Sequence, residues 1–305
     1  MPPVFPSPIG AATRYCAVLG RPIKHSASPA MQNAGLAALG LDWRYLAFEV
    51  DPTRLREAIA GAKAMHFIGL NLTVPHKLLA LELMDVLDES ARTWGAVNTV
   101  RFEGLDATGQ WRPLREFADS PPQVRAAGFN TDADAITRSL REDLAFEPSG
   151  ARILLLGAGG AGRTAALKLA AEGAVELHLV NRTADKAAAV AAEIRQRFPR
   201  TCVAIGYPER PVDLVLNATS LGLRESDASP LDETRFALGK AGCVYDMIYR
   251  PAETPLLRAA RAAGRRAANG IGMLLYQGAR ALELWTGVNP PIQVMREALE
   301  RNVYG

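Results

Sequence analysis

Cysteine and histidine are scarce in this chain. Its 305 residues include three cysteines, Cys16, Cys202 and Cys243, which lie far apart and form no Cys-x-x-Cys motif. We therefore expect each of them to be a small buried residue in a reducing compartment rather than half of a disulfide. The four histidines show no spacing typical of metal ligands, so the sequence predicts no metal site.

Excess charge and long apolar runs are also missing. The formal net charge of +3 is small and scattered, which argues against nucleic acid as a partner. No apolar run approaches the roughly 18 residues of a membrane span. Residues 1–12 are rich in proline and lack the basic and apolar regions of a signal peptide. We expect a cytoplasmic protein, a monomer or homodimer, with neither nucleic acid nor a membrane as its partner.

Strand-like apolar runs alternate with helix-like segments along most of the chain. This alternation predicts an α/β fold with open, mostly parallel sheets covered on both faces, and the length allows two domains. We expect residues 1–132, completed by 271–305, to form one domain and residues 133–270 the other. The predicted strands are 15–19, 43–48, 67–72, 96–102, 153–156, 176–180, 213–217, 243–248 and 266–268. The predicted helices are 29–39, 52–62, 75–84, 133–144, 165–171, 184–198, 255–263, 272–286 and 290–302.

One stretch, 104–127, fits neither pattern. It contains Gly, Asp, a Pro-Pro pair, three Arg and a Trp without a steady period. Uninterrupted loops of this length are uncommon in compact domains and are usually functional or disordered. Two interpretations stay open here: a surface excursion, or a lid over a nearby site.

A glycine-rich loop follows the buried strand 153–156. Gly157, Gly159 and Gly162 have the G-x-G-x-x-G spacing, and a helix follows them. Such a loop lets the backbone approach a pyrophosphate, with the N–H groups and dipole of the helix N-terminus facing the phosphate oxygens. The motif alone can be a simple tight turn, but its setting between strand and helix predicts a Rossmann-type dinucleotide site. The predicted cofactor loop comprises Gly157, Ala158, Gly159, Gly160, Ala161 and Gly162.

The next strand, 176–180, ends where a dinucleotide site selects its cofactor. An Asp or Glu there would bind the 2′-hydroxyl of NAD, but the sequence has Asn181, Arg182 and Thr183. A guanidinium can hold a 2′-phosphate bidentately, and Lys186 adds a second positive charge one helical turn later. An arginine by itself is more typical of a solvated surface, but the position of Arg182 favours NADP over NAD.

Polar motifs also follow the predicted strands of the first domain. Ser26 and Ser28 precede a helix and can present hydroxyl and N–H groups to an anion such as a carboxylate, although taken alone they favour simple N-capping of that helix. Asn71 and Thr73 share one face of a strand by period two, and Lys77 follows in a helical first turn, where the dipole disfavours it. Two further polar motifs follow along the chain. One contains Asn98 at the start of a strand, and the other contains Asp132, which also suits a helix cap.

Taken together, these motifs closely resemble those of the shikimate dehydrogenase family. The resemblance covers the chain from Tyr15 to about Thr286. In the first half it includes Pro-Ile-x-His-Ser-x-Ser-Pro at 22–29, Asn-Leu-Thr-Val-Pro-x-Lys at 71–77, Gly-Ala-Val-Asn-Thr at 95–99 and Asn-Thr-Asp at 130–132. In the second half it includes the glycine loop, Asn-Arg-Thr at 181–183, Asn-Ala-Thr-Ser-x-Gly at 217–222, Tyr-Asp-Met-Ile-Tyr at 245–249 and Gly-x-Gly-Met-Leu-x-x-Gln-Gly at 270–278.

The resemblance implies a reversible, NADPH-dependent reduction of 3-dehydroshikimate to shikimate. It implies that residues 1–132 with 271–305 bind the substrate and 133–270 bind NADP. The implied catalytic pair is Lys77 and Asp132. The implied substrate ligands are Ser26, Ser28, Asn71, Thr73, Asn98, Tyr249 and Gln277. Besides the glycine loop, the implied cofactor ligands are Asn181, Arg182, Thr183, Lys186, Asn217, Ala218, Thr219, Met247 and Gly270.

The chain departs from the family pattern at two places. Gln32-Asn33 stands where many members have His-Asn, and 104–127 is longer than the usual connection between its flanking motifs. Both leave open a quinate/shikimate dehydrogenase that uses NAD or both cofactors, against which Arg182 argues. A non-catalytic NADP-binding sensor is a further alternative, which the presence of Lys77 and Asp132 opposes.

Overall fold

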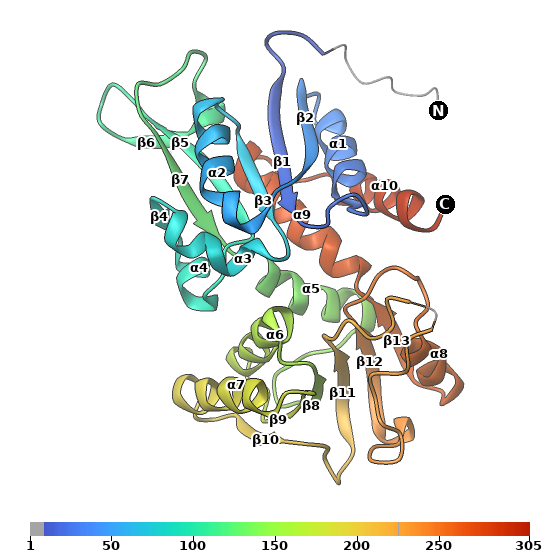
Figure 1. Ribbon diagram of the computed structural model, residues 1–305. Helices are drawn as coiled ribbons and strands as arrows, with labels where there is room; N and C mark the ends of the chain where they lie inside the picture. The colour runs from blue at the N-terminus through green and yellow to red at the C-terminus, as the bar shows by residue number, and fades with distance from the viewer. Residues whose placement is uncertain (1–8, 225) are drawn as a thin grey trace. The chain divides into compact units, whose positions relative to one another are not determined.

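The computed structural model describes residues 9–224 and 226–305, and these divide into two compact units. Unit 1 comprises the described residues up to Thr131 with Gln277–Val303 and Gly305, and unit 2 comprises Asp132–Tyr276 with Tyr304. Each unit contains its own sheet with helices packed against it (Figure 1). The α/β class predicted from the sequence is therefore confirmed.

A mixed sheet forms the centre of unit 1, with parallel and antiparallel strand pairs in equal number. Its strands are β1 (Arg14–Gly20), β2 (Trp43–Glu49), β3 (Gly69–Leu72), β4 (Val86–Leu87), β5 (Thr99–Leu105), β6 (Trp111–Pro113) and β7 (Val124–Phe129). The order of this seven-stranded sheet is β2-β1-β3-β5-β7-β4, with β6 paired to β5. β5 runs antiparallel to β3, β6 and β7, whereas β2, β1 and β3 are parallel to one another. The sequence did not predict β4, β6 or β7.

Helices cover the sheet of unit 1. They are α1 (Ser28–Ala38), η1 (Pro52–Arg54), α2 (Leu55–Ala64), α3 (His76–Leu79), η2 (Ala80–Leu83), α4 (Glu89–Trp94), η3 (Leu114–Glu116), the end of α9 (Ile271–Thr286) and α10 (Ile292–Tyr304). In Figure 1, α2 lies in front of the sheet and α9 behind it. The helix predicted over 75–84 is present over residues 76–83, but only its first four residues are α-helical and the rest is a 3-10 helix. This segment buries only His76 and Ala80, so it has no continuous apolar face to stabilise a longer α-helix.

Trp285 fixes α9 to the unit 1 sheet. Its side chain is fully buried, and its Nε1 donates a hydrogen bond of 2.9 Å to the carbonyl oxygen of Val100 on β5. Gly69 on β3 makes this approach possible, because a Cβ there would lie 2.0 Å from Trp285 Nε1. The helix that carries Gln277 is thus held against the centre of the sheet.

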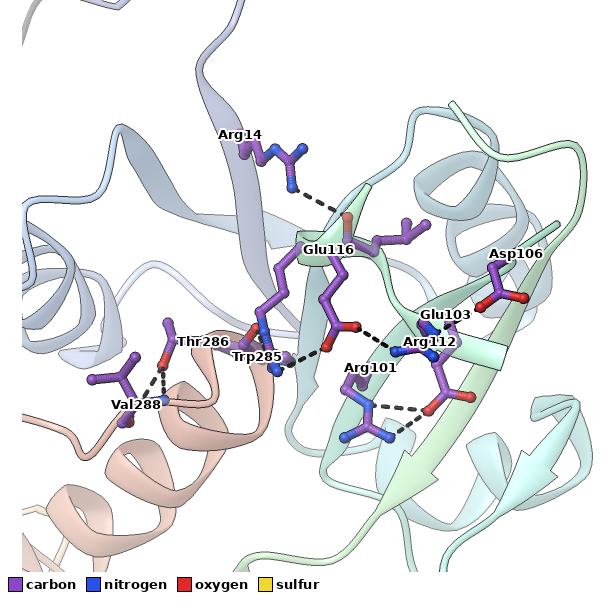
Figure 2. A network of polar contacts seen from close by, with 11 residues as sticks. Arg14, Arg101, Glu103, Asp106, Arg112, Glu116, Trp285, Thr286 and Val288 are labelled. Atoms are coloured by element: carbon purple, nitrogen blue, oxygen red, sulfur yellow. Dashed lines mark hydrogen bonds and ion pairs between the residues drawn. The ribbon is translucent and has the colours of Figure 1, made fainter. Parts of the chain in front are cut away.

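The stretch 104–127 is not an uninterrupted loop, and its position contradicts the interpretation as a lid. It completes β5, turns at Asp106, pairs back as β6 and returns to the sheet as β7. The Nη1 of Arg14, the first residue of β1, donates 3.2 Å to Leu114 O in this stretch (Figure 2). The stretch therefore packs at the edge where β1 begins, whereas the predicted site residues follow the opposite ends of β1 and β3. Glycine, proline and charge obscured the three-residue strand β6 and the six-residue strand β7.

Unit 2 has an entirely parallel sheet. Its strands are β8 (Arg152–Leu156), β9 (Glu176–Val180), β10 (Cys202–Ile205), β11 (Val212–Asn217), β12 (Ala241–Asp246) and β13 (Arg266–Asn269). Their order, β10-β9-β8-β11-β12-β13, is the doubly wound order of dinucleotide-binding folds, with its switch point between β8 and β11. The helices of this unit are α5 (Asp132–Leu144), α6 (Gly160–Ala171), α7 (Ala184–Arg197), η4 (Leu238–Lys240), α8 (Pro255–Ala262) and the beginning of α9.

The burial of each cysteine depends on its position in a strand. Cys16 and Cys243 are buried. The pKa of the Cys243 thiol is raised to about 11, mainly because the thiol is buried. The expectation of burial is wrong for Cys202, which is exposed. It opens the edge strand β10, where the next residue, Val203, faces the core instead. Among the described residues, no helix is both long and apolar enough to cross a membrane.

Candidate active site and dinucleotide site

Backbone hydrogen bonds gather the polar motifs of unit 1 at one edge of its sheet. Leu72 N donates a hydrogen bond of 2.9 Å to Asn98 O, and Asn98 N donates one of 3.1 Å to Phe129 O. Thr73 N donates 3.0 Å to Leu19 O. The ends of β1, β3 and β7 therefore meet the beginning of β5. Because β5 is antiparallel, its first residues share this edge with the carboxyl ends of the parallel strands.

The side-chain amides of Asn71 and Asn98 have fixed orientations at this edge. Asn98 Oδ1 accepts 2.7 Å from the backbone N–H of Thr131, which can only donate, so Asn98 Nδ2 lies toward Thr131 Oγ1 at 2.9 Å. Asn71 Nδ2 donates 3.2 Å to Asn98 O, a carbonyl that can only accept, and 3.0 Å to Thr99 Oγ1. Both residues are buried, with exposed fractions of 6% and 2%. The amides are therefore preorganised by the backbone around them.

Tyr45 completes this network and was not among the predicted site residues. Its hydroxyl donates 2.7 Å to Asn71 Oδ1, and its side chain is buried on β2. Burial raises the pKa of Tyr45 well above its ordinary value, the Cys16 thiol raises it further, and a hydrogen bond with Ser28 lowers it. The phenol is thus a permanent donor at neutral pH. Its only sequence signal is an aromatic residue in a strand, which is equally typical of an ordinary core.

The two predicted serines lie at the start of α1. Ser28 is its first residue and is buried, while Ser26 is half-buried. The N-cap residue is Ala27, without a side-chain hydrogen bond, so neither serine is the conventional cap. Ser28 N donates a long hydrogen bond of 3.4 Å to Ser26 Oγ. Two serines thus lie at the N-terminus of a helix, a position that suits an anionic group.

Lys77 and Gln277 are held in unit 1 by neighbouring main-chain contacts. The carbonyl of Lys77, on α3, accepts 2.9 Å from Val97 N, directly before Asn98. Gln277 precedes Gly278, whose carbonyl accepts 2.9 Å from the buried Nε2 of Gln32. The unusual Gln32 therefore ties α1 to α9. Unit 1 thus contains Ser26, Ser28, Asn71, Thr73, Lys77, Asn98 and Gln277.

Two predicted residues of the active site belong to unit 2. Asp132 is buried and begins α5, one residue after Thr131 of the amide network. Tyr249 follows β12 and is half-buried; burial raises its pKa, and Arg250 lowers it.

The glycine loop of unit 2 has the shape that a pyrophosphate requires. Gly157 has a φ of +104°, and a Cβ there would lie 2.9 Å from the backbone of Ala218. A Cβ on Gly162 would lie 2.1 Å from Gly157 O, so only glycine lets α6 begin so close to β8. Gly159 has nothing within 4 Å of a Cβ position. One glycine makes the turn, one allows close packing, and one leaves the approach open. These residues fit a dinucleotide.

Arg182 is available at the end of β9. Asn181 is committed to the loop, since its Oδ1 accepts 2.9 Å from Ala158 N and its Nδ2 donates 2.8 Å to Thr183 O. Arg182, Thr183 and Lys186 are exposed. Within residues 9–224 and 226–305, the side chains of Arg182 and Lys186 have no hydrogen bond or ion pair, so both charges can meet a ligand.

Asn217, one of the remaining predicted cofactor residues, contacts a buried carboxylate that sequence reasoning missed. Asp246 Oδ1 accepts 2.9 Å from Asn217 Nδ2, and its Oδ2 accepts 2.7 Å from Thr254 Oγ1. Burial raises the pKa of Asp246, partly offset by these hydrogen bonds and one from Ile248 N. Asn217 Oδ1 in turn accepts 2.7 Å from Thr219 Oγ1. Asn217 and Thr219 thus shape the loop after β11, and Ala218 lies half-buried between them.

Gly270 fixes the loop after β12. A Cβ on Gly270 would lie 2.1 Å from Met247 O. The half-buried Met247 donates from its N–H to Asn217 O at 2.9 Å. Asn217, Met247 and Gly270 therefore form one packed group beyond the carboxyl ends of the unit 2 strands, where this fold binds its ligand.

Comparisons with known proteins give matches along most of the chain. Family models match in three places: shikimate dehydrogenase substrate binding domain at residues 18–100, shikimate / quinate 5-dehydrogenase at residues 140–220, and shikimate 5′-dehydrogenase C-terminal domain at residues 270–300. A shikimate dehydrogenase (NADP(+)) of Methanopyrus kandleri is 41% identical over 95% of this chain and 96% of its own length. That of Geobacter metallireducens is 42% identical over 94% and 96%.

A solved structure shows the same similarity in three dimensions. The shikimate 5-dehydrogenase from Thermus thermophilus, in complex with NADP(H) and shikimate, is 36% identical to this chain. It matches with a TM-score of 0.78 over 95% of this chain and 99% of that one.

Proposed function

Because the chain belongs to the shikimate dehydrogenase family, we propose that it catalyses the reversible, NADPH-dependent reduction of 3-dehydroshikimate to shikimate. One structural observation carries this proposal beyond the similarity. The sheet edge of unit 1 holds the oriented amides of Asn71 and Asn98 together with the main-chain anchor of Lys77. Such uncharged, buried hydrogen-bonding groups suit a polyhydroxylated ring, because an analogue lacking a hydroxyl leaves them unpaired.

The substrate carboxylate has a complementary position in this proposal. Ser26 and Ser28 supply hydroxyls beside a helix N-terminus, which favours negative charge. Tyr249 adds a phenol from unit 2, and Thr73 and Gln277 supply further polar groups. These residues bind and orient the ring and take no part in bond making.

Lys77 and Asp132 are the proposed catalytic pair. NADPH, when bound, supplies the hydride that reduces the ring carbonyl carbon. Lys77 Nζ stabilises the negative charge that develops on the carbonyl oxygen and gives that oxygen a proton. Asp132 orients the lysine and a substrate hydroxyl. In the reverse direction, Lys77 Nζ takes the proton back from the hydroxyl.

The cofactor preference rests on the exposed charges after β9. The loop from Gly157 to Gly162 binds the pyrophosphate, while Arg182 and Lys186 bind the 2′-phosphate of NADP. Asn181 and Thr183 shape that pocket. Asn217, Ala218, Thr219, Met247 and Gly270 lie along the remainder of the cofactor.

The test is an initial-rate assay at the nicotinamide absorbance, with shikimate and quinate each measured against NADP and NAD. We expect turnover with shikimate and NADP to exceed the other three combinations. Comparable turnover of quinate, or with NAD, would instead indicate a broader quinate/shikimate dehydrogenase. Binding of NADP without turnover of either acid would indicate a non-catalytic sensor.

A further inference from the structure

Tyr45 is held in place independently of its hydroxyl group. Asn33 on α1 clamps its backbone, with Asn33 Nδ2 donating 2.8 Å to Tyr45 O and Tyr45 N donating 2.9 Å to Asn33 Oδ1. The phenol ring packs against the buried Trp285, with 6.0 Å between ring centroids. Removing only the hydroxyl therefore leaves the strand and the ring where they are. What the hydroxyl contributes is its hydrogen bond to Asn71 and its hydrogen bond with Ser28, and only the first of these acts through Asn71.

The hydrogen-bond count at Asn71 is nearly complete without a ligand. Both hydrogens of Nδ2 are used, one by Asn98 O and one by Thr99 Oγ1. Tyr45 fills one of the two acceptor positions of Oδ1. The amide cannot be turned around, because its oxygen would then face Asn98 O, a carbonyl that can only accept. One acceptor position on Oδ1 is all that Asn71 can offer to a substrate.

Asn98 has the opposite capacity. Its Oδ1 already accepts from Thr131 N at 2.7 Å, and one hydrogen of Nδ2 goes to Thr131 Oγ1 at 2.9 Å. The second Nδ2 hydrogen has no partner among the described residues. Two amides on one sheet edge thus have complementary roles, one accepting and one donating.

We propose that Tyr45 is a positioning residue that makes Asn71 an acceptor-only group toward the substrate, so that Asn71 selects a ring hydroxyl. This inference rests on the proposed function and deepens it. An acceptor cannot hydrogen-bond to a ketone oxygen, which has no proton. Asn71 therefore binds a hydroxyl that persists through the reaction, and the carbonyl that is reduced lies at a donor such as Lys77.

The first test compares Tyr45→Phe with wild type and with Tyr15→Phe as a matched control. Tyr15 lies on the adjacent strand β1 and packs on Phe67, and its hydroxyl has no hydrogen bond among the described residues. In Tyr45→Phe, the Asn71 amide is held through Nδ2 alone. We expect the KM for shikimate to rise about five-fold, the equivalent of one net hydrogen bond, with kcat and the KM for NADP within about two-fold. Tyr15→Phe should change none of the three.

A double-mutant cycle with Asn71→Ala separates positioning from a general structural role. If Tyr45 acts through Asn71, the Tyr45→Phe change should alter the shikimate KM by less than about two-fold once Asn71 is alanine. An equal effect in both backgrounds, or no effect in wild type, would overturn the proposal. Wild-type turnover of shikimate is the reference, so its absence would refute the proposed function rather than this inference.

A second measurement needs no variant at Tyr45. Fluorine has about the size of a hydroxyl but cannot donate a hydrogen bond. Shikimate analogues in which each ring hydroxyl in turn is replaced by fluorine or by hydrogen can be titrated into the wild type and Asn71→Ala by calorimetry. At one position, the fluoro analogue should bind wild type as weakly as the deoxy analogue, and both more weakly than shikimate. Asn71→Ala should bind shikimate and that fluoro analogue with the same affinity. If every fluoro analogue binds as tightly as shikimate, Asn71 accepts no substrate proton and the inference is wrong.

Discussion

Glu103 offers a test of whether the stretch 104–127 is part of the sheet or part of the active site. Glu103 lies on β5 with 3% of its surface exposed, between Arg101 and Arg125. Arg125 Nη2 lies 2.7 Å from Glu103 Oε2, and Arg101 Nε donates 3.1 Å to Oε1 (Figure 2 shows Arg101 and Glu103). Replacing Glu103 by alanine therefore leaves two neighbouring guanidinium groups without their carboxylate.

The expected loss follows from the burial of the three side chains. Removing one partner of a fully buried ion pair costs about 3–5 kcal/mol. The arginine side chains here are 24% and 30% exposed, so water compensates part of that loss. We expect Glu103→Ala to lower the free energy of unfolding by about 2–3 kcal/mol, and Glu103→Gln, which keeps an acceptor oxygen, to lower it by about 1–2 kcal/mol.

Urea unfolding measures this loss, with Glu57→Ala as the control. Glu57 pairs with Arg54 at an exposed site on α2, so its removal should leave the unfolding midpoint unchanged. Glu103 lies four residues beyond the start of β5, about 13 Å along the strand from the candidate site. The shikimate KM and kcat of Glu103→Ala should therefore stay within about two-fold of wild type. An unchanged unfolding midpoint, or a change of more than five-fold in either kinetic constant while the protein stays folded, would refute this reasoning.

The remaining predictions concern unit 2. Arg182→Ala should raise the KM for NADP about 30- to 100-fold through loss of a bidentate phosphate contact, without affecting NAD, and an equal loss with both cofactors would make Arg182 structural. Gly162→Ala should abolish NADPH binding measured by fluorescence, because its methyl group would lie 2.1 Å from Gly157 O; binding within five-fold of wild type would contradict this. Burial raises the pKa of the Glu172 carboxyl group. Hydrogen bonds from Lys168 and Arg141 outweigh this effect, so the pKa lies below its ordinary value of 4.5. The stability that Glu172 contributes is present above pH 4.5 and is lost as the pH falls through the lower pKa of the folded state. The difference in unfolding free energy between wild type and Glu172→Gln should therefore shrink between pH 6 and pH 3. A constant difference would show that Glu172 is not ionically coupled.

Much of unit 2 could be predicted from sequence because its signals are local. A buried strand, three spaced glycines and a following helix are consecutive in the chain, and the sterics at Gly157 and Gly162 explain why glycine is needed there. Arg182 was recognised by its distance from that loop. Asp246 was missed because a buried carboxylate is identified only by donors from separate loops, such as Asn217 and Thr254.

The candidate site of unit 1 was harder to predict because it depends on strand direction. Asn98 opens a strand, and in a parallel sheet that position would lie at the opposite edge from Asn71. Only the antiparallel course of β5 brings them together, and two of its three antiparallel partners, β6 and β7, were not predicted from the sequence. Tyr45 is joined to the site by contacts with residues 12 and 26 positions away, Asn33 and Asn71. The assignment of each residue to substrate or cofactor stays a prediction.

The most direct test of the proposed catalysis is NADPH oxidation with 3-dehydroshikimate by wild type, Lys77→Ala and Lys63→Ala. Lys63 pairs with Asp85 on the surface of unit 1 and serves as the control. We predict that Lys77→Ala loses about a thousand-fold in kcat, while NADPH binding and the shikimate affinity stay within about ten-fold. Lys63→Ala should match wild type. Turnover by Lys77→Ala within five-fold of wild type would contradict the role of Lys77 in protonating the substrate oxygen.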